Sequence, residues 1–184
     1  VLNDNELDLG AVVLEIGATK TSLSIFSKGS FLFSEVINFG GNDITHAIAR
    51  FFGISFNEAE KIKIMHASVI EHSSNSEISF EIPSINFNNS ENFINISKKD
   101  LYKIVEPFVE NILKWTRVVI GKSGYEKIIS NQLVITGGGA QLDGIAILAK
   151  NNLNYNSRIG FPKEFKSDLE NNLDPSHSVA LGII

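Results

Sequence analysis

Short apolar or alternating runs near the start of the sequence predict strands. Three such runs cover residues 11–16, 21–27 and 31–38, and the glycine-containing corners GATK and SKGS separate them. A period of two places successive side chains on opposite faces of a sheet, and short corners join strands that lie side by side. We therefore expect an antiparallel three-stranded meander over residues 11–38.

After the third run, the apolar spacing changes to three and four, which is typical of helices. The first helix is expected to begin at an N-cap, Asn42 or Asp43, and to end near Gly53; the second follows Ser55 or Asn57. The apolar positions that predict these helices are Ile44, Ala47, Ile48 and Phe51 in the first and Ala59, Ile62 and Met65 in the second.

Residues 67–97 predict short β segments at ASVIEH, EISFEI and NFINIS, joined by exposed loops rich in asparagine and serine, such as FNNSENF. A long helix is expected over residues 98–121, with Ser97 as its N-cap. Pro107 lacks an amide hydrogen and is expected to kink or break this helix. Its apolar positions recur at helical spacing: Leu101, Ile104, Val105, Phe108, Ile112 and Trp115.

The last third of the sequence alternates between strand and helix patterns. We expect a buried strand that ends in a glycine corner at NQLVITGGG, followed by a helix at AQLDGIAILAKNN. A short strand is expected at SRIGFP, and the start of another helix at DPSHSVALGII. A meander, an intervening segment and a strand–helix–strand tail predict an α/β domain with a mixed sheet and a smaller α+β lobe inserted into it.

The composition excludes several classes of function. The 184 residues carry a formal net charge of −5, which disfavours binding to nucleic acid. The absence of cysteine rules out disulfides, thiolate metal sites and a cysteine nucleophile, and the four histidines are scattered without metal-ligand spacing. No apolar run approaches the roughly 18 residues that a membrane-spanning helix needs. Because the sequence begins at Val1 and ends in an apolar run, we expect a piece of a longer protein.

Candidate chemistry begins at the first corner, where Glu15 is followed by Gly17, Thr19 and Thr21. A carboxylate beside exposed turn amides and hydroxyls can hold phosphoryl oxygens while the acid orients a hydrated Mg²⁺ ion or a water molecule. An ordinary hairpin turn would use the same residues. The corner is not a P-loop, which needs a lysine directly after its second glycine.

Two more features are compatible with a nucleotide. The glycines at 137–139 could form a flat surface for a purine or ribose beside a helix N-terminus that favours phosphate, or could simply allow tight packing of strand against helix. Glu60 and Lys63 lie three residues apart on one helix face, where they could bind a ligand or form a solvated ion pair.

Taken in order, these features resemble the FtsA family of bacterial cell-division proteins, within the actin-like ATPase superfamily and its ribonuclease H-like fold. The resemblance covers the whole sequence and implies the second half of such a protein. It assigns residues 1–40 and 121–184 to subdomain IIA and residues 41–120 to an inserted subdomain IIB. The stretches that carry it are FGGNDITHAIARFFGISFNEAEKIKIMHAS, ISKKDLYKIVEPFVENI, LVITGGGAQLDGIAILAK, SRIGFP and SHSVALGII.

The resemblance implies ATP and Mg²⁺ as ligands. Glu15 occupies the place of the family's aspartate, which acts on Mg²⁺ and on the attacking water. The nucleotide-binding positions that it implies are Gly17, Ala18, Thr19, Lys20 and Thr21 at the β- and γ-phosphates, Gly41 near the nucleotide, Glu60 and Lys63 beside the ribose and adenine, and Gly137, Gly138 and Gly139 beneath the adenosine.

The sequence departs from the family pattern at the phosphate corner. Ala18, Thr19 and Lys20 interrupt a run of glycines, Ser22 replaces an acid or amide, and Glu15 is one methylene longer than aspartate. A misplacement of about 1 Å can lower a rate by roughly 100-fold. We expect slow or absent hydrolysis, with the nucleotide acting on assembly, and an isolated chain that is inactive.

The resemblance also implies partners. The inserted lobe matches the FtsA subdomain that receives the C-terminal peptide of FtsZ, and Lys114 and Arg117 would suit acidic anchors of such a peptide. For the full-length protein it implies self-association into protofilaments, contacts with other divisome proteins, and a C-terminal helix that holds it at the inner face of the cell membrane at the division site.

Two alternatives remain. The pilus-assembly protein PilM has a similar phosphate hairpin and a similar GG to AEK segment, although KIMHASV, the inserted β region and RIGFP favour FtsA. A sugar kinase-type phosphotransferase would need a catalytic aspartate and a sugar pocket, and this sequence supplies no such base.

Overall fold

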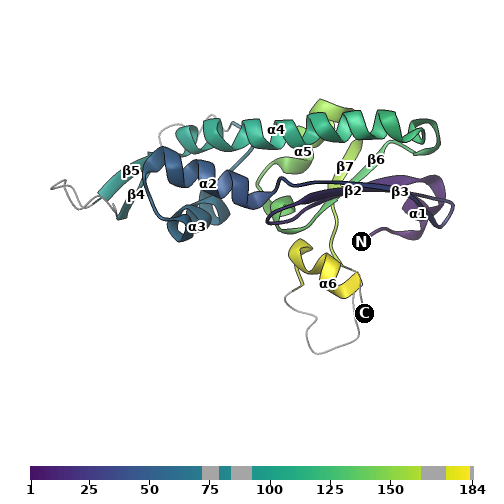
Figure 1. The fold of residues 1–184 in the computed structure, drawn as a ribbon, viewed down its shortest axis with the longest axis horizontal. Coiled ribbons are helices and arrows are strands. Elements are labelled where there is room, and N and C mark those ends of the chain that lie inside the picture. Colours follow the sequence, from purple (N-terminus) through teal and green to yellow (C-terminus); the bar gives the residue numbers. More distant parts are fainter. Residues whose placement is uncertain (72–78, 84–92, 163–172, 183–184) are drawn as a thin grey trace.

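The chain folds around a five-stranded mixed sheet. The computed structural model describes residues 1–71, 79–83, 93–162 and 173–182. The molecule is elongated: the large sheet lies at one end, a two-stranded sheet lies at the other, and helix α4 (Lys98–Ser123) runs along most of the length (Figure 1).

The strand order of the large sheet is β3-β2-β1-β6-β7. The first three strands pair antiparallel, and β6 and β7 add to β1 in parallel. This confirms the predicted meander and the mixed sheet. The strands of this sheet are β1 (Ala11–Ile16), β2 (Thr21–Ser27), β3 (Ser30–Ile37), β6 (Gln132–Thr136) and β7 (Asn156–Ile159); β4 (Ser79–Pro83) and β5 (Phe93–Ser97) form the small one.

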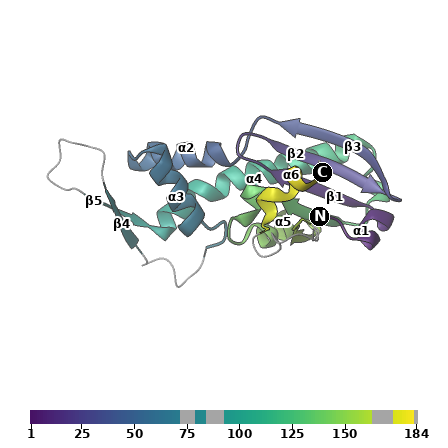
Figure 2. The same ribbon diagram turned by 90° about the horizontal axis from the view of Figure 1, so that it is seen from below.

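Helices cover both faces of the large sheet. Helix α4 lies on one face, and the short helices α1 and α6 lie toward the other (Figures 1 and 2). None of the helices in the described ranges has the length and apolar character needed to cross a bilayer. The other helical elements are α1 (Asp4–Leu9), α2 (Gly41–Phe52), α3 (Phe56–His66), α5 (Ile145–Leu153) and α6 (Ser178–Gly182), with 3₁₀ turns η2 (Glu126–Ile128), η3 (Gly138–Gln141) and η4 (Pro175–His177).

The predicted N-cap of α3 is confirmed, whereas that of α2 is not. The N-cap of α2 is Gly40, because Asp43 occupies the third helical position and its carboxylate accepts from the N–H of Gly40 (2.8 Å). The predicted N-cap at Asn42 or Asp43 is therefore wrong. Ser55 does cap α3, in a reciprocal arrangement with Glu58.

A break of α4 at Pro107 and burial of Met65 are two expectations that the structure contradicts. Pro107 does not break α4: it lies on the exposed side, while Val105 and Val109 on either side of it are fully buried. Water can therefore solvate the carbonyl that lacks an amide partner. Met65 is 63% exposed, although Ala59 and Ile62 are buried as expected.

Other segments are shorter than predicted or were missed. Residues 67–71 form only an isolated bridge between Ser68 and Asp143. The glycine corner leads into the 3₁₀ turn η3, so α5 begins at Ile145 instead of Ala140. Helix α1 was not predicted; its N-cap is Asn3. The loop FNNSENF lies almost wholly outside the described residues.

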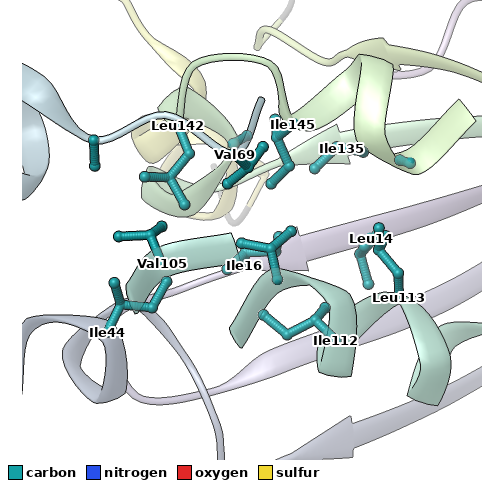
Figure 3. Packing of buried hydrophobic residues seen from close by; sticks show 14 of the residues in the cluster. Leu14, Ile16, Ile44, Val69, Val105, Ile112, Leu113, Ile135, Leu142 and Ile145 are labelled. Atoms are coloured by element: carbon teal, nitrogen blue, oxygen red, sulfur yellow. The ribbon is translucent and has the colours of Figure 1, made fainter. Parts of the chain in front are cut away.

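The main core lies between α4 and the large sheet. Leu14 and Ile16 of β1 point toward Ile112 and Leu113 of α4 (Figure 3). The same core continues to Ile44 of α2, so helix α4 joins the sheet and the helical lobe in one apolar cluster. The boundaries at residues 40 and 120 stay a prediction.

An ion pair attaches α1 to the far edge of the sheet. The guanidinium of Arg158 on β7 donates to both carboxylate oxygens of Glu6 (2.6 and 2.5 Å) and to the carbonyl oxygen of Val1 (2.9 Å). The hydrogen bond from Arg158 lowers the pKa of Glu6 below its ordinary value of 4.5, although burial acts in the opposite direction. Glu6 is therefore charged at neutral pH.

Replacing Glu6 should test this attachment. We expect Glu6→Gln to lower the free energy of unfolding at neutral pH by roughly 1–2 kcal/mol, because a charge-assisted hydrogen bond is lost. A depressed carboxyl pKa stabilises the fold above pH 4.5, so the difference between the two proteins should shrink as the pH falls below that value. Urea unfolding across this range measures it. Glu35→Gln, on exposed β3, is the control, and equal losses in both variants would contradict the assignment.

Candidate functional site

A cavity of about 430 Å³ lies where the β1–β2 corner, helices α2 and α3, and turn η3 meet. It brings together residues that are more than 100 positions apart in the sequence. The predicted site residues that line it are Gly17, Ala18, Gly41, Glu60, Lys63, Gly138 and Gly139. Its other lining residues, which the sequence does not predict, are Asn42, Ile44, Ile64, Gln141, Leu142 and Asp174.

The β1–β2 corner is hydrogen-bonded to the first turn of α2. The N–H of Gly41 donates to the carbonyl oxygen of Gly17 (2.9 Å), and the N–H of Asn42 donates to that of Ala18 (2.7 Å). A Cβ atom on Gly40 would lie only 2.6 Å from the Gly17 oxygen, so the approach requires glycine there. The first N–H groups of α2 are therefore already hydrogen-bonded within the protein.

The amides of the corner itself remain available. Among the described residues, none accepts a hydrogen bond from the N–H of Ala18 or Thr19, and both residues are exposed. Thr19 and Lys20 do not line the cavity. Thr21 is fully buried, and its hydroxyl donates to the carbonyl oxygen of Phe39 (2.7 Å), so its side chain supports the corner from within.

Glu60 and Lys63 form an ion pair at the cavity wall, with Lys63 Nζ 2.7 Å from Glu60 Oε2. The hydroxyl of Thr45 on α2 contacts both groups. Burial acts to raise the pKa of Glu60, but the hydrogen bonds from Lys63 and Thr45 and the charge of Lys63 outweigh it, so the pKa lies below 4.5. The wall thus carries a carboxylate at neutral pH.

Two of the three corner glycines are required by packing. A Cβ atom on Gly137 would lie 2.5 Å from the carbonyl oxygen of Ile16, and one on Gly139 would lie 2.3 Å from Ile16 Cγ2. Gly138 is different: it is exposed, and the nearest atom to a Cβ there is 3.9 Å away, on Ser176. Tight packing therefore explains Gly137 and Gly139, whereas Gly138 offers the open surface that a nucleoside would need.

Glu15 does not line this cavity. Because side chains alternate along β1, it lies on the sheet face opposite Leu14 and Ile16, where its Oε2 accepts from the hydroxyl of Ser22 (3.0 Å). There it lines a separate open cavity of about 410 Å³ together with Thr136. In the described part of the chain, no three His, Asp or Glu side chains cluster to hold a metal ion.

Lys114 and Arg117 line a groove of about 300 Å³ between α4 and α5. Lys114 pairs with Glu110 (3.0 Å), and Arg117 donates to the carbonyl oxygen of Asn152 near the end of α5. One wall of this groove therefore comes from the chain after residue 121, outside the inserted lobe predicted over residues 41–120.

The missed lining residues carried only weak signals. Ile44 follows helical spacing, which by itself indicates only a core position. Thr45 does not line the cavity but contacts the Glu60–Lys63 pair in its wall, and a single threonine in an amphipathic helix gives no functional pattern. Asp174 precedes Pro175 in a segment that the sequence predicts only as a helix start, and only the fold brings it to the cavity.

Comparison with known proteins identifies the family. The family model described as "Cell division protein FtsA" matches residues 12–182. The chain belongs to the FtsA family. FtsA of Rhizobium meliloti is 27% identical over 183 residues, and FtsA of Borreliella burgdorferi is 30% identical over 187; each alignment covers all of this chain but only 41% and 44% of the relative. This FtsA-family chain thus spans less than half the length of these relatives.

Solved structures confirm the actin-like fold. MreB5 of Spiroplasma citri bound to ADP superposes with a TM-score of 0.76 at 19% identity, covering 98% of this chain and 54% of that one. The PilM–PilN type IV pilus biogenesis complex gives 0.68 at 24% identity, covering 97% and 46%. At these identities the likeness shows the fold alone, and the family model favours FtsA over the PilM alternative.

The two kinds of glycine can be separated by substitution. Gly139→Ala should lower the free energy of unfolding by roughly 1–3 kcal/mol, because the added methyl collides with the fully buried Ile16 side chain. Gly138→Ala should change it by less than about 0.5 kcal/mol, because the space there is open. Urea denaturation of both variants measures the contrast, and a Gly139→Ala protein as stable as Gly138→Ala would refute the packing explanation.

Proposed function

We propose that this FtsA-family chain binds ATP, with the adenosine in the 430 Å³ cavity and the phosphates at the β1–β2 corner. The observation that carries the proposal is the convergence of three segments on one cavity: the corner with free amides at Ala18 and Thr19, the Glu60–Lys63 pair, and the open glycine surface at Gly138. The similarity to MreB5 solved with ADP supports it.

The size and chemistry of the cavity suit a nucleoside. Pockets for small ligands occupy roughly 300–1,000 Å³ and combine apolar walls with a few polar groups. Here Ile44, Ile64 and Leu142 supply apolar surface, and Glu60 and Asp174 supply carboxylates. Two acids and one lysine would repel phosphates, so the charged part of the ligand fits better at the exposed amides of the corner.

Glu15 is proposed to act on the phosphate side through a hydrated Mg²⁺. A single carboxylate, held by Ser22, fits an ion that keeps most of its water and takes its other ligands from phosphate. The bound ion would neutralise phosphate charge. The extra methylene of Glu15 and the side chains of Thr19 and Lys20 favour slow or absent hydrolysis, with the nucleotide controlling assembly.

At the level of the whole protein, we propose that this chain supplies the second half of a cell-division protein that links FtsZ filaments to the cytoplasmic membrane at the division site. Residues 1–40 and 121–184 would form one subdomain, because their strands share a sheet, and residues 41–120 the inserted one. Self-association and contacts with other division proteins belong to the same proposal.

The FtsZ C-terminal peptide is proposed to bind in the groove between α4 and α5. Lys114 and Arg117 face this groove, and Leu113, Val118 and Leu153 supply apolar surface. A short peptide with acidic and apolar anchors would match both properties.

The nucleotide proposal can be tested by filling the cavity. In the full natural protein that carries this chain, Gly138→Leu should weaken ATP binding at least about tenfold, because the side chain would occupy the nucleoside space. Gly121→Leu is the matched control: it also lies in open space, on α4, away from the cavity. Calorimetry measures both. Absence of ATP binding by the unmodified protein, or equal binding by both variants, would overturn the proposal.

The peptide proposal has its own test. Reversing both charges, Lys114→Glu with Arg117→Glu, should weaken binding of an FtsZ C-terminal peptide about tenfold or more, because acidic anchors would then be repelled. Lys122→Glu, on the same helix outside the groove, should bind as the unmodified protein does. Fluorescence anisotropy of a labelled peptide measures the three affinities, and binding that survives the double reversal excludes this groove.

A further inference from the structure

We infer that Thr45 is a positioning residue which, with Lys63, holds Glu60 so that one carboxylate oxygen receives the hydroxyl groups of the bound ribose. The inference rests on the proposed nucleotide binding and goes beyond it, because it assigns different tasks to the two members of the ion pair. Glu60 would contact the ligand, and Lys63 and Thr45 would orient Glu60.

Lys63 has no hydrogen-bond donor left for a ligand. Its ammonium group carries three N–H bonds. They are directed to the carbonyl oxygen of Gly41 (3.0 Å), the hydroxyl of Thr45 (2.8 Å) and Oε2 of Glu60 (2.7 Å). The Lys63 side chain is also only 11% exposed. It therefore acts as an internal cation that joins α2 to α3.

Thr45 completes this arrangement from inside the protein. Its side chain is fully buried, accepts from Lys63, and lies within hydrogen-bonding distance of Oε2 of Glu60 and of the Gly41 carbonyl oxygen. The contacts to Lys63 and Thr45 both involve Oε2. Within the described residues, Oε1 of Glu60 makes no hydrogen bond, and the side chain lines the cavity and is 34% exposed.

The available oxygen selects a type of ligand group. A carboxylate oxygen only accepts hydrogen bonds, so it recognises a donor. Within a nucleoside, the ribose hydroxyls are donors that can approach a carboxylate as a pair. A site built to bind a hydroxyl discriminates strongly against an analogue that lacks it, because the buried polar group then has no partner. Ribose recognition should therefore depend on how firmly Glu60 is held.

The test compares ADP with 2′,3′-dideoxy-ADP in the full natural protein. The unmodified protein should prefer ADP by about 10- to 100-fold, the range expected for hydrogen bonds to a charged group. Thr45→Val, which keeps the shape but removes the hydroxyl, should reduce this preference to a few-fold. Thr45→Ser should retain it, because the hydroxyl is present. A merely structural role of Thr45 would weaken both ligands equally and leave the ratio unchanged.

Lys63→Met provides a second test, because it removes the cation that orients Glu60. It should also reduce the preference for ADP over the dideoxy analogue, and thermal unfolding shows whether each variant is folded. An unmodified protein that binds ADP and the dideoxy analogue equally would overturn the inference while the nucleotide proposal stands. A preserved ratio in folded Thr45→Val would also overturn it. An unmodified protein that binds neither ligand would overturn the proposed function itself.

Discussion

At the end of β1, two other segments approach the backbone so closely that side chains are excluded between them. Turn η3 packs Gly137 and Gly139 against Ile16, and the start of α2 packs Gly40 against Gly17 and Ala18. Each approach leaves a hypothetical Cβ atom less than 3 Å from its neighbour, which an ordinary residue could not tolerate. The cavity exists because these approaches bring three distant segments around one strand end.

The same contacts distribute the polar groups of the site. The carbonyl oxygens of Gly17 and Ala18 accept from the first amides of α2, while the amides of Ala18 and Thr19 remain free on the exposed corner. A helix N-terminus that would otherwise attract an anion is thus occupied, and the anion-binding capacity belongs to the turn instead. The ion pair on α3 shows a similar division, because Lys63 is saturated within the protein and Glu60 keeps one free oxygen.

Much of the fold could be predicted because its elements are locally specified. Strand β2 alternates between buried and half-buried side chains, and the cap at Ser55 has its partner Glu58 three residues on. The errors occur where a distant contact overrides the local pattern. Gly40 caps α2 because the corner binds the first helical amides. Pro107 does not interrupt α4 because it lies on the exposed side of the helix, while its neighbours Val105 and Val109 are buried in the core.

The sequence by itself determined the family, the mixed sheet and seven of the residues that line the cavity, because periodicity, turn chemistry and the order of motifs are properties of neighbouring positions. Only the tertiary structure decided how those residues are used. It placed Glu15 on the opposite face from the cavity, assigned two of the three glycines to packing, and added Thr45 to the ion pair. These outcomes depend on which hydrogen-bonding groups meet across the fold, and that is set by contacts between segments far apart in the chain.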